Sequence, residues 1–403
     1  MTCIVQKYGG SSVADVPKLQ QIAARIADIK NRQIDIAVVV SAMGKSTDNL
    51  VALARDISAN PPRREMDMLL STGERTAMSL LSIALHALGV EAVSLTGSQA
   101  GIITNHRHND AQVIEVRPFR VQDELAAGRV VIVGGFQGVS YKRDITTLGR
   151  GGSDTSAVAL AAALNADRCE IYSDVDGVYS ADPSLVTDAW HLKEISYPAM
   201  QEMSTAGARV LNAGAVQFAK EKNIAIYARS TFAPGQQTIV RRLSPGSIMG
   251  VQAVVHEQSI ERLALYGEGV PSRFAAVIDF LENEQVPVKE VNVATADGTT
   301  ANARASFVVS SDHVYGWEAI RNRLKNEIDP DISCQENLAA VSLIGEGLNR
   351  DNQTLLETMK LLEGGGIAVR GIATTAFRIS LIVSKEQVQA CTRLCHDHWI
   401  TQK

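Results

Sequence analysis

The sequence predicts an α/β fold, in which a mainly parallel sheet is sandwiched by helices and is followed by two copies of a smaller unit. Residues 1–240 alternate short β-branched runs with helical stretches, which is typical of a parallel sheet covered on both faces. The remainder contains two similar segments, and self-similarity that preserves the order of strands and helices indicates duplicated units. We therefore expect domains over residues 1–240, 241–334 and 335–403.

Short apolar runs predict six strands in the first domain. They are expected at Cys3–Gln6, Ile36–Val40, Ala92–Leu95, Val130–Val133, Arg168–Tyr172 and Ile224–Ala228. A helix should follow the first strand, with Asp15 as its N-cap and Pro17 in its first turn. Its apolar stripe, at spacings of three and four, is Leu19, Ile22, Ala23, Ile26 and Ile29.

The duplicated units begin with related strands. The run Leu263–Val270 recurs as Val341–Leu348, and both runs contain Gly-Glu-Gly. A helical apolar stripe follows each run, formed by Phe274, Val277, Ile278 and Leu281 in one copy and by Leu355, Met359 and Leu362 in the other. A second similarity between the copies relates Val286–Lys289 to Ile367–Arg370. Each copy is predicted to run strand, helix, two strands, helix, with a final strand that is clearer in the first copy.

Composition excludes several classes of protein. The 403 residues are 45% apolar and 21% charged, as in soluble globular proteins. The net charge of −5 does not indicate the excess of basic residues that is typical of nucleic-acid-binding proteins. No apolar run reaches the length of a membrane span, and the N-terminus lacks a signal-peptide pattern. We expect a cytoplasmic protein with neither a nucleic-acid nor a membrane partner.

The cysteines indicate a reducing compartment, because they are few, odd in number and scattered. They are Cys3, Cys169, Cys334, Cys391 and Cys395. The last two, with His396 and His398, could hold a metal, but their spacing on a single helix is poor for tetrahedral closure. We favour buried small residues on a helix face and predict no metal site there.

The run Thr147–Ala157 carries the strongest chemical signal. It places Gly149, Arg150, Gly151, Gly152 and Asp154 ahead of an apolar helical segment. Glycines let the backbone approach an anion, and the N–H groups at the start of a helix point at it. An arginine can fork onto a carboxylate or phosphate, and a carboxylate can orient a metal or a lysine. This inventory suits phosphoryl transfer.

Two further blocks accompany this run, namely Lys7–Ser12 and Ile171–Pro183. Neither is a Walker P-loop or a kinase-type G-x-G-x-x-G loop. In this order the three blocks resemble the aspartokinase branch of the amino-acid kinase family. The resemblance covers most of residues 1–240 and includes Val40–Gly44, Leu70–Arg75, Phe136–Val139 and Glu194–Tyr197.

The resemblance implies that ATP, with Mg²⁺, phosphorylates the β-carboxylate of L-aspartate to give 4-phospho-L-aspartate. That reaction opens the route to lysine, threonine and methionine, or a dedicated branch of it. The acceptor is already ionised at neutral pH, so no general base is required. The implied catalytic residues are Lys7 and Asp154, with Gly9, Gly10 and Ser11 assisting at the phosphates. The simpler alternatives are a surface lysine before a turn and a plain helix N-cap at Asp154.

By the same resemblance, the two ends of the amino-acid acceptor meet complementary charges. Glu74 would accept from its ammonium group, Arg150 would fork onto a carboxylate, and Ser41 and Thr47 would add hydroxyl contacts. The alternatives are a surface loop arginine and, for Glu74, an acid in the first turn of a helix.

The third block resembles the family's nucleotide site. The implied nucleotide-binding residues are Lys7, Gly9, Gly10, Ser11, Ser173, Asp174, Asp176, Gly177, Val178, Tyr179, Asp182, Arg229 and Ser230. Tyr179 would flank the adenine, and Asp182 would lie by the ribose or the metal. The alternative for the Asp-Gly turn is a simple hairpin.

The duplicated tail resembles paired ACT domains, which are ferredoxin-like βαββαβ modules that bind small effectors and pair across subunits. A homodimer or a higher even homo-oligomer is therefore implied, with lysine or threonine as a possible effector. Relatives carry an Asp-x-Pro-Gly turn and a Ser-Glu pair where this chain has Gly267–Ser272 and Thr374–Phe377. We expect weak or absent inhibition by lysine, and threonine is the better candidate.

Two departures lie in the first domain. Asn212-Ala213 replaces a usual His-Pro, and a loop contains His106, His108 and Asp110, which could suggest a metal although a solvated loop is favoured. Two other functions stay open, namely a kinase for another small acid such as glutamate and a catalytically silent amino-acid sensor. The joint presence of Lys7, Glu74, Arg150 and Asp154 argues against the silent sensor.

Overall fold

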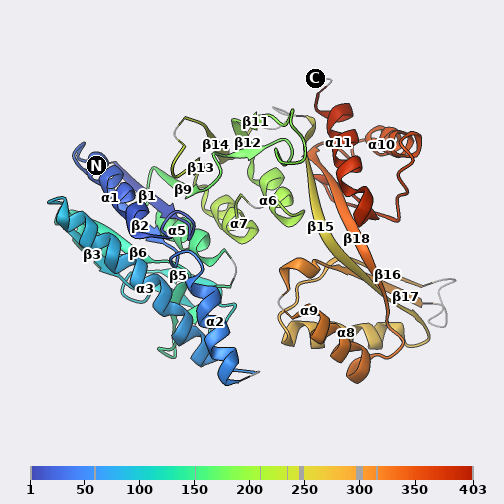
Figure 1. The fold of residues 1–403 in the computed structure, drawn as a ribbon, viewed down its shortest axis with the longest axis horizontal. Coiled ribbons are helices and arrows are strands. Elements are labelled where there is room, and N and C mark those ends of the chain that lie inside the picture. The colour runs from blue at the N-terminus through green and yellow to red at the C-terminus, as the bar shows by residue number, and fades with distance from the viewer. Residues whose placement is uncertain are drawn as a thin grey trace. The chain divides into compact units, whose positions relative to one another are not determined.

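The computed structural model describes residues 2–58, 60–149, 151–208, 210–233, 235–244, 249–295, 303–314 and 316–401. The chain forms two compact units (Figure 1). The first comprises Met1–Val178, His191–Thr205 and Arg209–Pro245, and the second Tyr179–Trp190, Ala206–Ala208 and Gly246–Lys403.

The first unit is built on an eight-stranded sheet in the order β12-β14-β13-β9-β1-β2-β6-β3. The strands are β1 Cys3–Tyr8, β2 Asp35–Val40, β3 Ala92–Leu95, β6 Val130–Gly134, β9 Arg168–Ser173, β12 Glu194–Ser196, β13 Ile226–Ser230 and β14 Gln237–Arg241. Neighbouring strands from β3 to β13 run parallel, and β14 pairs antiparallel with β13. All six predicted strands are present in this sheet, so the predicted fold class is confirmed.

Helices cover both faces of this sheet. One face packs on α1 (Val16–Lys30) and α3 (Arg63–Ala87) through a core that contains Ile36, Val38 and Val40. The alternate residues of β2 are equally buried, and α4 (Phe119–Ala126) and α5 (Gly152–Ala163) contact β2 as well. The predicted cap of α1 is confirmed, because the side chain of Asp15 accepts a hydrogen bond from Lys18 N at 2.9 Å.

Smaller elements complete the first unit. A second sheet has the order β5-β4-β7-β8, with β4 Ile102–Thr104, β5 Val113–Val116, β7 Gln137–Ser140 and β8 Ile145–Thr147. The remaining helices are α2 Ser46–Ile57, α6 Tyr197–Thr205 and α7 Ala213–Lys222. The short pair β10 (Val178–Tyr179) and β11 (His191–Leu192) flanks the segment that clusters with the second unit.

The second unit contains a six-stranded antiparallel sheet in the order β16-β17-β15-β18-β20-β19. Its strands are β15 Gly250–Gly267, β16 Lys289–Thr295, β17 Ala303–Val309, β18 Ser333–Glu346, β19 Gly371–Thr374 and β20 Arg378–Ser384. Its α-helices are α8 Val270–Asn283, α9 Trp317–Arg323, α10 Gln353–Gly364 and α11 Val388–Trp399.

The two duplicated copies share their longest strands. The start of β15 contributes Val251 and Val254 to the core of the second copy, and its end contributes Leu263 and Leu265 to the core of the first. The final strand of the second copy is therefore supplied from upstream in the chain, by the part of β15 that pairs with the end of β18. The boundary predicted between residues 334 and 335 falls inside β18.

The C-terminal cysteines lie where a packed helix face predicts them. Cys391 and Cys395 are fully buried in the core of the second copy. Nε2 of His396 lies 2.9 Å from Oγ of Ser180. Within the part of the chain that the structure describes, the one group of three potential metal ligands is Glu261, Cys334 and Glu336 elsewhere in this unit.

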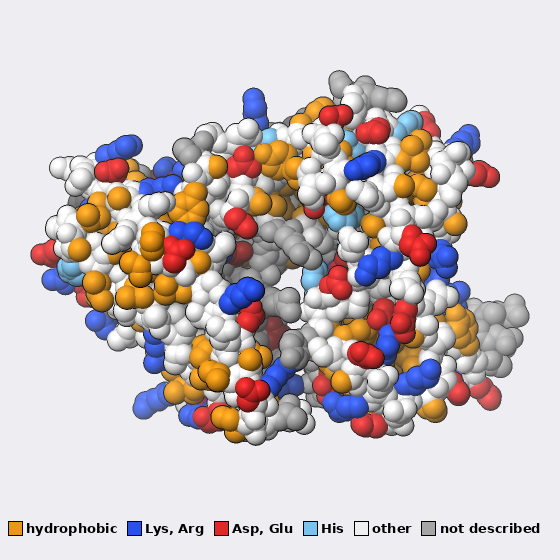
Figure 2. Space-filling model, in the orientation of Figure 1, with side chains coloured by type: hydrophobic (Ala, Val, Ile, Leu, Met, Phe, Trp, Pro, Cys, Tyr) orange, Lys and Arg blue, Asp and Glu red, His pale blue; other side chains and the backbone are white. Residues whose placement is uncertain are grey.

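The surface carries both signs of charge. Figure 2 shows Lys and Arg side chains interspersed with Asp and Glu on the face in view. Among the described residues, no helix combines the length and apolar character needed to cross a bilayer.

Candidate active site

The loops that follow the parallel strands bring the predicted site residues of the first unit together. Lys7 is the penultimate residue of β1, and Ser41 follows β2 directly. The loop after β2 passes between two glycines, since a Cβ on Gly10 would lie 3.0 Å from the Ala42 carbonyl oxygen and one on Gly73 would lie 2.8 Å from the Ala42 Cβ. The carboxyl edge of such a sheet is where α/β proteins bind ligands.

Lys7 and Asp154 form an ion pair at this edge. Nζ of Lys7 lies 2.6 Å from Oδ1 of Asp154, and the side chains are 12% and 11% exposed. The interpretation of Lys7 as a surface lysine is therefore wrong. Asp154 is the third residue of α5, and the N-cap is Gly151 at φ 71°, so the N-cap alternative for Asp154 is wrong as well. A negative charge in this first turn is favoured by the helix dipole.

Glu74 is a buried carboxylate with one free oxygen. It lies in the middle of α3, which rules out the first-turn alternative. Its Oε1 accepts a hydrogen bond from Ala42 N at 3.1 Å, and Oε2 has no hydrogen-bond partner among the described residues. Burial raises the pKa of Glu74 to about 7, although hydrogen bonds from backbone N–H groups oppose that rise. A cationic ligand group would satisfy both the free oxygen and the buried charge.

Of the three other residues predicted to bind the acceptor, the structure describes Ser41 and Thr47. Ser41 is partly buried beside the bond between Ala42 and Glu74, and Thr47 is the second residue of α2. Arg150 lies outside the described residues. Its neighbour Gly151 packs against Asn212, because a Cβ on Gly151 would lie 2.3 Å from Nδ2 of Asn212. Asn212 also caps α7 by accepting from Ala215 N.

The predicted nucleotide block follows β9. Gly177 has φ 151°, and a Cβ there would lie 2.3 Å from Nε2 of His191. Val178 N donates to Oγ1 of Thr238 at 2.8 Å. In the main sheet β9 lies between β1 and β13, while β10 pairs with β11, so the simple-hairpin alternative is wrong. Ser173 is partly buried, Asp174 and Asp182 are exposed, and Oδ1 of Asp182 accepts from Ser184 N at 2.9 Å.

Arg229 and Ser230 end β13, beside the end of β9. The guanidinium of Arg229 contacts protein groups: NH1 lies 2.9 Å from Oε1 of Glu170, and Nε donates to Oε1 of Gln237 at 2.7 Å. Ser230 Oγ accepts from Ala233 N. Their role in nucleotide binding stays a prediction.

Sequence reasoning missed Asp67. It is fully buried on the same face of α3 as Glu74 and contacts His108. The signal was a carboxylate at a position of the helix's apolar stripe, which includes Leu70, Ala77 and Leu81. The prediction of a solvated loop holds for His106 and Asp110, which are exposed, and is wrong for His108.

Comparison with known proteins identifies the family. The profile of the amino acid kinase family matches residues 2–230. The chain is 40% identical over 409 residues to an aspartokinase of Mycolicibacterium smegmatis, covering 98% of this chain and 96% of that one. It is 39% identical over 399 residues to an aspartokinase of Bacillus sp. (strain MGA3), with coverage of 98% and 97%. The chain belongs to the aspartokinases.

Solved aspartokinases share the fold. E. coli aspartokinase III in complex with aspartate and ADP has a TM-score of 0.79 at 23% identity, covering 98% of this chain and 99% of that one. The aspartate kinase of Clostridium acetobutylicum has a TM-score of 0.70 at 19% identity, with coverage of 99% and 100%. This aspartokinase is thus an enzyme that phosphorylates aspartate with ATP, and the two C-terminal copies are ACT domains.

Proposed function

We propose that Lys7 and Asp154 act together on the phosphoryl group that moves from ATP to aspartate. The observation that carries this proposal is their 2.6 Å ion pair at the carboxyl edge of the sheet. The acceptor carboxylate is ionised at neutral pH, so the difficulty is bringing two anions together. A lysine held in place by a carboxylate neutralises charge that develops during the transfer.

The nucleotide lies, in this proposal, over the turn after β1 and the block after β9. Gly9 N donates to Tyr172 O at 3.1 Å, which holds the two segments together. The Mg²⁺ that accompanies ATP neutralises phosphate charge, and Asp154 would hold Lys7 or the magnesium-bound phosphates in register.

The acceptor site is proposed to consist of Glu74, Arg150, Ser41 and Thr47. Oε2 of Glu74, which has no hydrogen-bond partner among the described residues, supports this role, because an ammonium group is the natural partner of a buried carboxylate oxygen. Arg150 would bind a carboxylate of aspartate as a bidentate fork.

We further propose that the enzyme is a cytoplasmic homodimer or higher even oligomer that opens a biosynthetic route to lysine, threonine and methionine. The edge strands β16 and β19 support oligomerisation, since Val291, Val293 and Ile372 are exposed on them and open edges invite pairing. Mass measurement at micromolar concentration tests this, and a strict monomer would contradict it.

The test of substrate choice is an ATP-dependent hydroxamate assay with aspartate, glutamate and other small acids. We expect a product with aspartate. Turnover with glutamate at a higher kcat/KM would favour the kinase for another acid, and inactivity with every acid would favour the silent sensor.

A further inference from the structure

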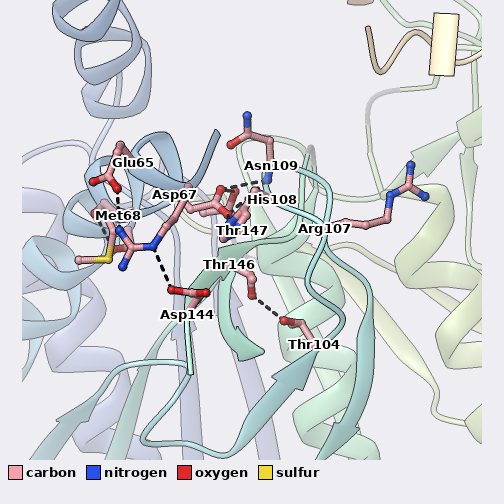
Figure 3. Close-up of polar contacts among 12 residues, drawn as sticks. Glu65, Asp67, Met68, Thr104, Arg107, His108, Asn109, Asp144, Thr146 and Thr147 are labelled. Carbon is pink, nitrogen blue, oxygen red and sulfur yellow. Dashed lines mark hydrogen bonds and ion pairs between the residues drawn. The ribbon is translucent and has the colours of Figure 1, made fainter. Parts of the chain in front are cut away.

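Asp67 is a buried carboxylate that contacts His108, Asn109 and Thr147. It is fully buried, and Nδ1 of His108 lies 2.6 Å from its Oδ2. Asn109 N donates to Oδ1 at 3.0 Å, and the hydroxyl of Thr147 donates to the same oxygen (Figure 3). Because a carboxylate only accepts, Nδ1 of His108 is the donor in its contact.

These contacts join two segments that lie far apart in the sequence. His108 and Asn109 belong to the loop between β4 and β5, which Asn105 closes by accepting from Arg107 N and Gln112 N. Thr147 is the last residue of β8 and the first of the glycine-rich run. Ala111 N donates to Thr147 O at 2.8 Å, and a Cβ on Gly149 would lie 2.9 Å from Oδ1 of Asp110. The loop therefore packs along the start of the run.

Asp67 is also linked to the acceptor site through its helix. Glu74 lies seven residues further along α3, which is two turns and hence the same face. Arg150 follows Gly149 directly in the chain. One rigid helix thus carries Glu74 and, through Asp67, holds the backbone that leads to Arg150.

We propose that Asp67 is a positioning residue for the amino-acid acceptor: by anchoring Thr147 and the loop at His108, it holds the start of the glycine-rich run against the helix that carries Glu74. This inference rests on the acceptor site proposed above. A side chain that orients a substrate clamp acts on substrate use even when it never touches the substrate, since small misplacements cost large factors in rate.

The test compares two neighbouring threonines in the full-length enzyme. Thr147→Val removes the hydroxyl that Asp67 accepts, and Thr147→Ser retains one. Thr146→Val is the matched control, because Thr146 is equally buried and its hydroxyl pairs with Oγ1 of Thr104 at 2.6 Å instead. Kinetic constants for aspartate and ATP and the melting temperature are measured for each variant.

We expect Thr147→Val to raise the KM for aspartate about tenfold and to leave the KM for ATP within about twofold. Thr147→Ser should recover the wild-type KM for aspartate, and Thr146→Val should lower only the melting temperature. In the double variant with Asp67→Asn the effects should not add, because both changes break one contact. If Thr147→Val does not fold, His108→Ala is measured in its place, because His108 lies at a partly exposed loop position. This variant should also raise the KM for aspartate.

Equal values of KM for aspartate in Thr147→Val and Thr146→Val would overturn the inference and leave Asp67 a purely structural residue. Glu74→Gln, measured in parallel, separates the two proposals. If Glu74→Gln leaves the KM for aspartate unchanged, the acceptor site itself is wrong. If only Glu74→Gln raises it, the acceptor site stands and the positioning role fails.

Discussion

Glu74 in the first unit and Asp329 in the second are both buried carboxylates, and their pKa values are shifted in opposite directions. Arg273 donates to both oxygens of Asp329, at 2.7 Å and 2.6 Å, and these bonds lower the pKa of Asp329. Among the described residues no cation pairs with Glu74, and burial raises its pKa to about 7. A carboxylate whose oxygens both accept from an arginine is expected to stabilise the fold, whereas the raised pKa and open oxygen of Glu74 are the features on which its proposed role in binding aspartate rests.

The largest effect on turnover is expected from the ion pair between Lys7 and Asp154. Lys7→Ala and Asp154→Ala should each lower kcat by about 10²–10³-fold, since charge stabilisation in the transition state is lost. The control is Lys30→Ala, because Lys30 at the end of α1 forms another ion pair with Asp35 of β2, at 3.3 Å and 19% exposure on each side. Steady-state kinetics and circular dichroism are measured, and near wild-type turnover in either catalytic variant would contradict the assignment.

The next effect concerns the pH at which Glu74 becomes ionised. With a pKa of about 7, Glu74 is protonated below that pH and cannot hold an ammonium group. Its ionised fraction rises about tenfold between pH 6 and pH 8, so kcat/KM for aspartate should rise by a similar factor. Glu74→Gln should have a low value that does not change with pH. The same rise in Glu74→Gln would assign the titration to another group.

Arg150, the second clamp proposed for the acceptor, should respond differently. Arg150→Lys keeps the positive charge but loses the bidentate fork. We expect a higher KM for aspartate, little change in the KM for ATP, and a pH dependence like that of the wild type. An unchanged KM for aspartate would exclude Arg150 as a clamp.

Removing the arginine that pairs with Asp329 should lower stability without lowering activity. Arg273→Leu leaves Asp329 without its cation and should lower the free energy of unfolding by about 1–3 kcal/mol, with kinetic constants unchanged. Because the pKa of Asp329 is lowered on folding, the difference should be full above about pH 4 and shrink as pH falls further. Arg323→Leu, which breaks a more exposed pair with Glu284, is the control with an effect under about 1 kcal/mol. Denaturant unfolding measures both, and equal losses would contradict the comparison.

The smallest effect is expected from effectors in the second unit. Gly269 forms the N-cap of α8 in the first copy, whereas α10 begins only at Gln353, after Gly347, in the second. The two turns therefore differ in structure although both contain Gly-Glu-Gly. We expect millimolar lysine to lower the rate less than about twofold and threonine to act somewhat more strongly. Steady-state rates with each amino acid decide this, and strong inhibition by lysine alone would be incompatible with it.

The sequence was most informative where apolar runs were long or motifs were dense. The strands at Ile36 and Val130 are nearly continuous apolar runs, and they and the strand at Cys3 were located to within two residues. The four-stranded sheet of β4, β5, β7 and β8 was missed because its strands have three or four residues each and mix polar with apolar side chains.

The site was predicted unevenly for a related reason. Lys7 and Asp154 lie in glycine-rich blocks, whose chemistry is local in sequence. The role of Asp67 depends on His108 and Thr147, which are 41 and 80 residues away, and no local pattern encodes such a contact. The final strand of the second ACT copy was unclear for the same reason, because β15 supplies it from upstream.

The sharing of β15 and β18 constrains how the chain is made. During synthesis β15 emerges first, yet its central position in the sheet requires β18, which emerges much later. Val251 and Val254 at the start of β15 pack in the core of the second copy, whose other members belong to β18 and later elements, so the start of β15 stays uncovered until β18 has left the ribosome. A message cut short before β18 would yield a chain in which the start of β15 has no core to pack in, a natural substrate for chaperones and proteases.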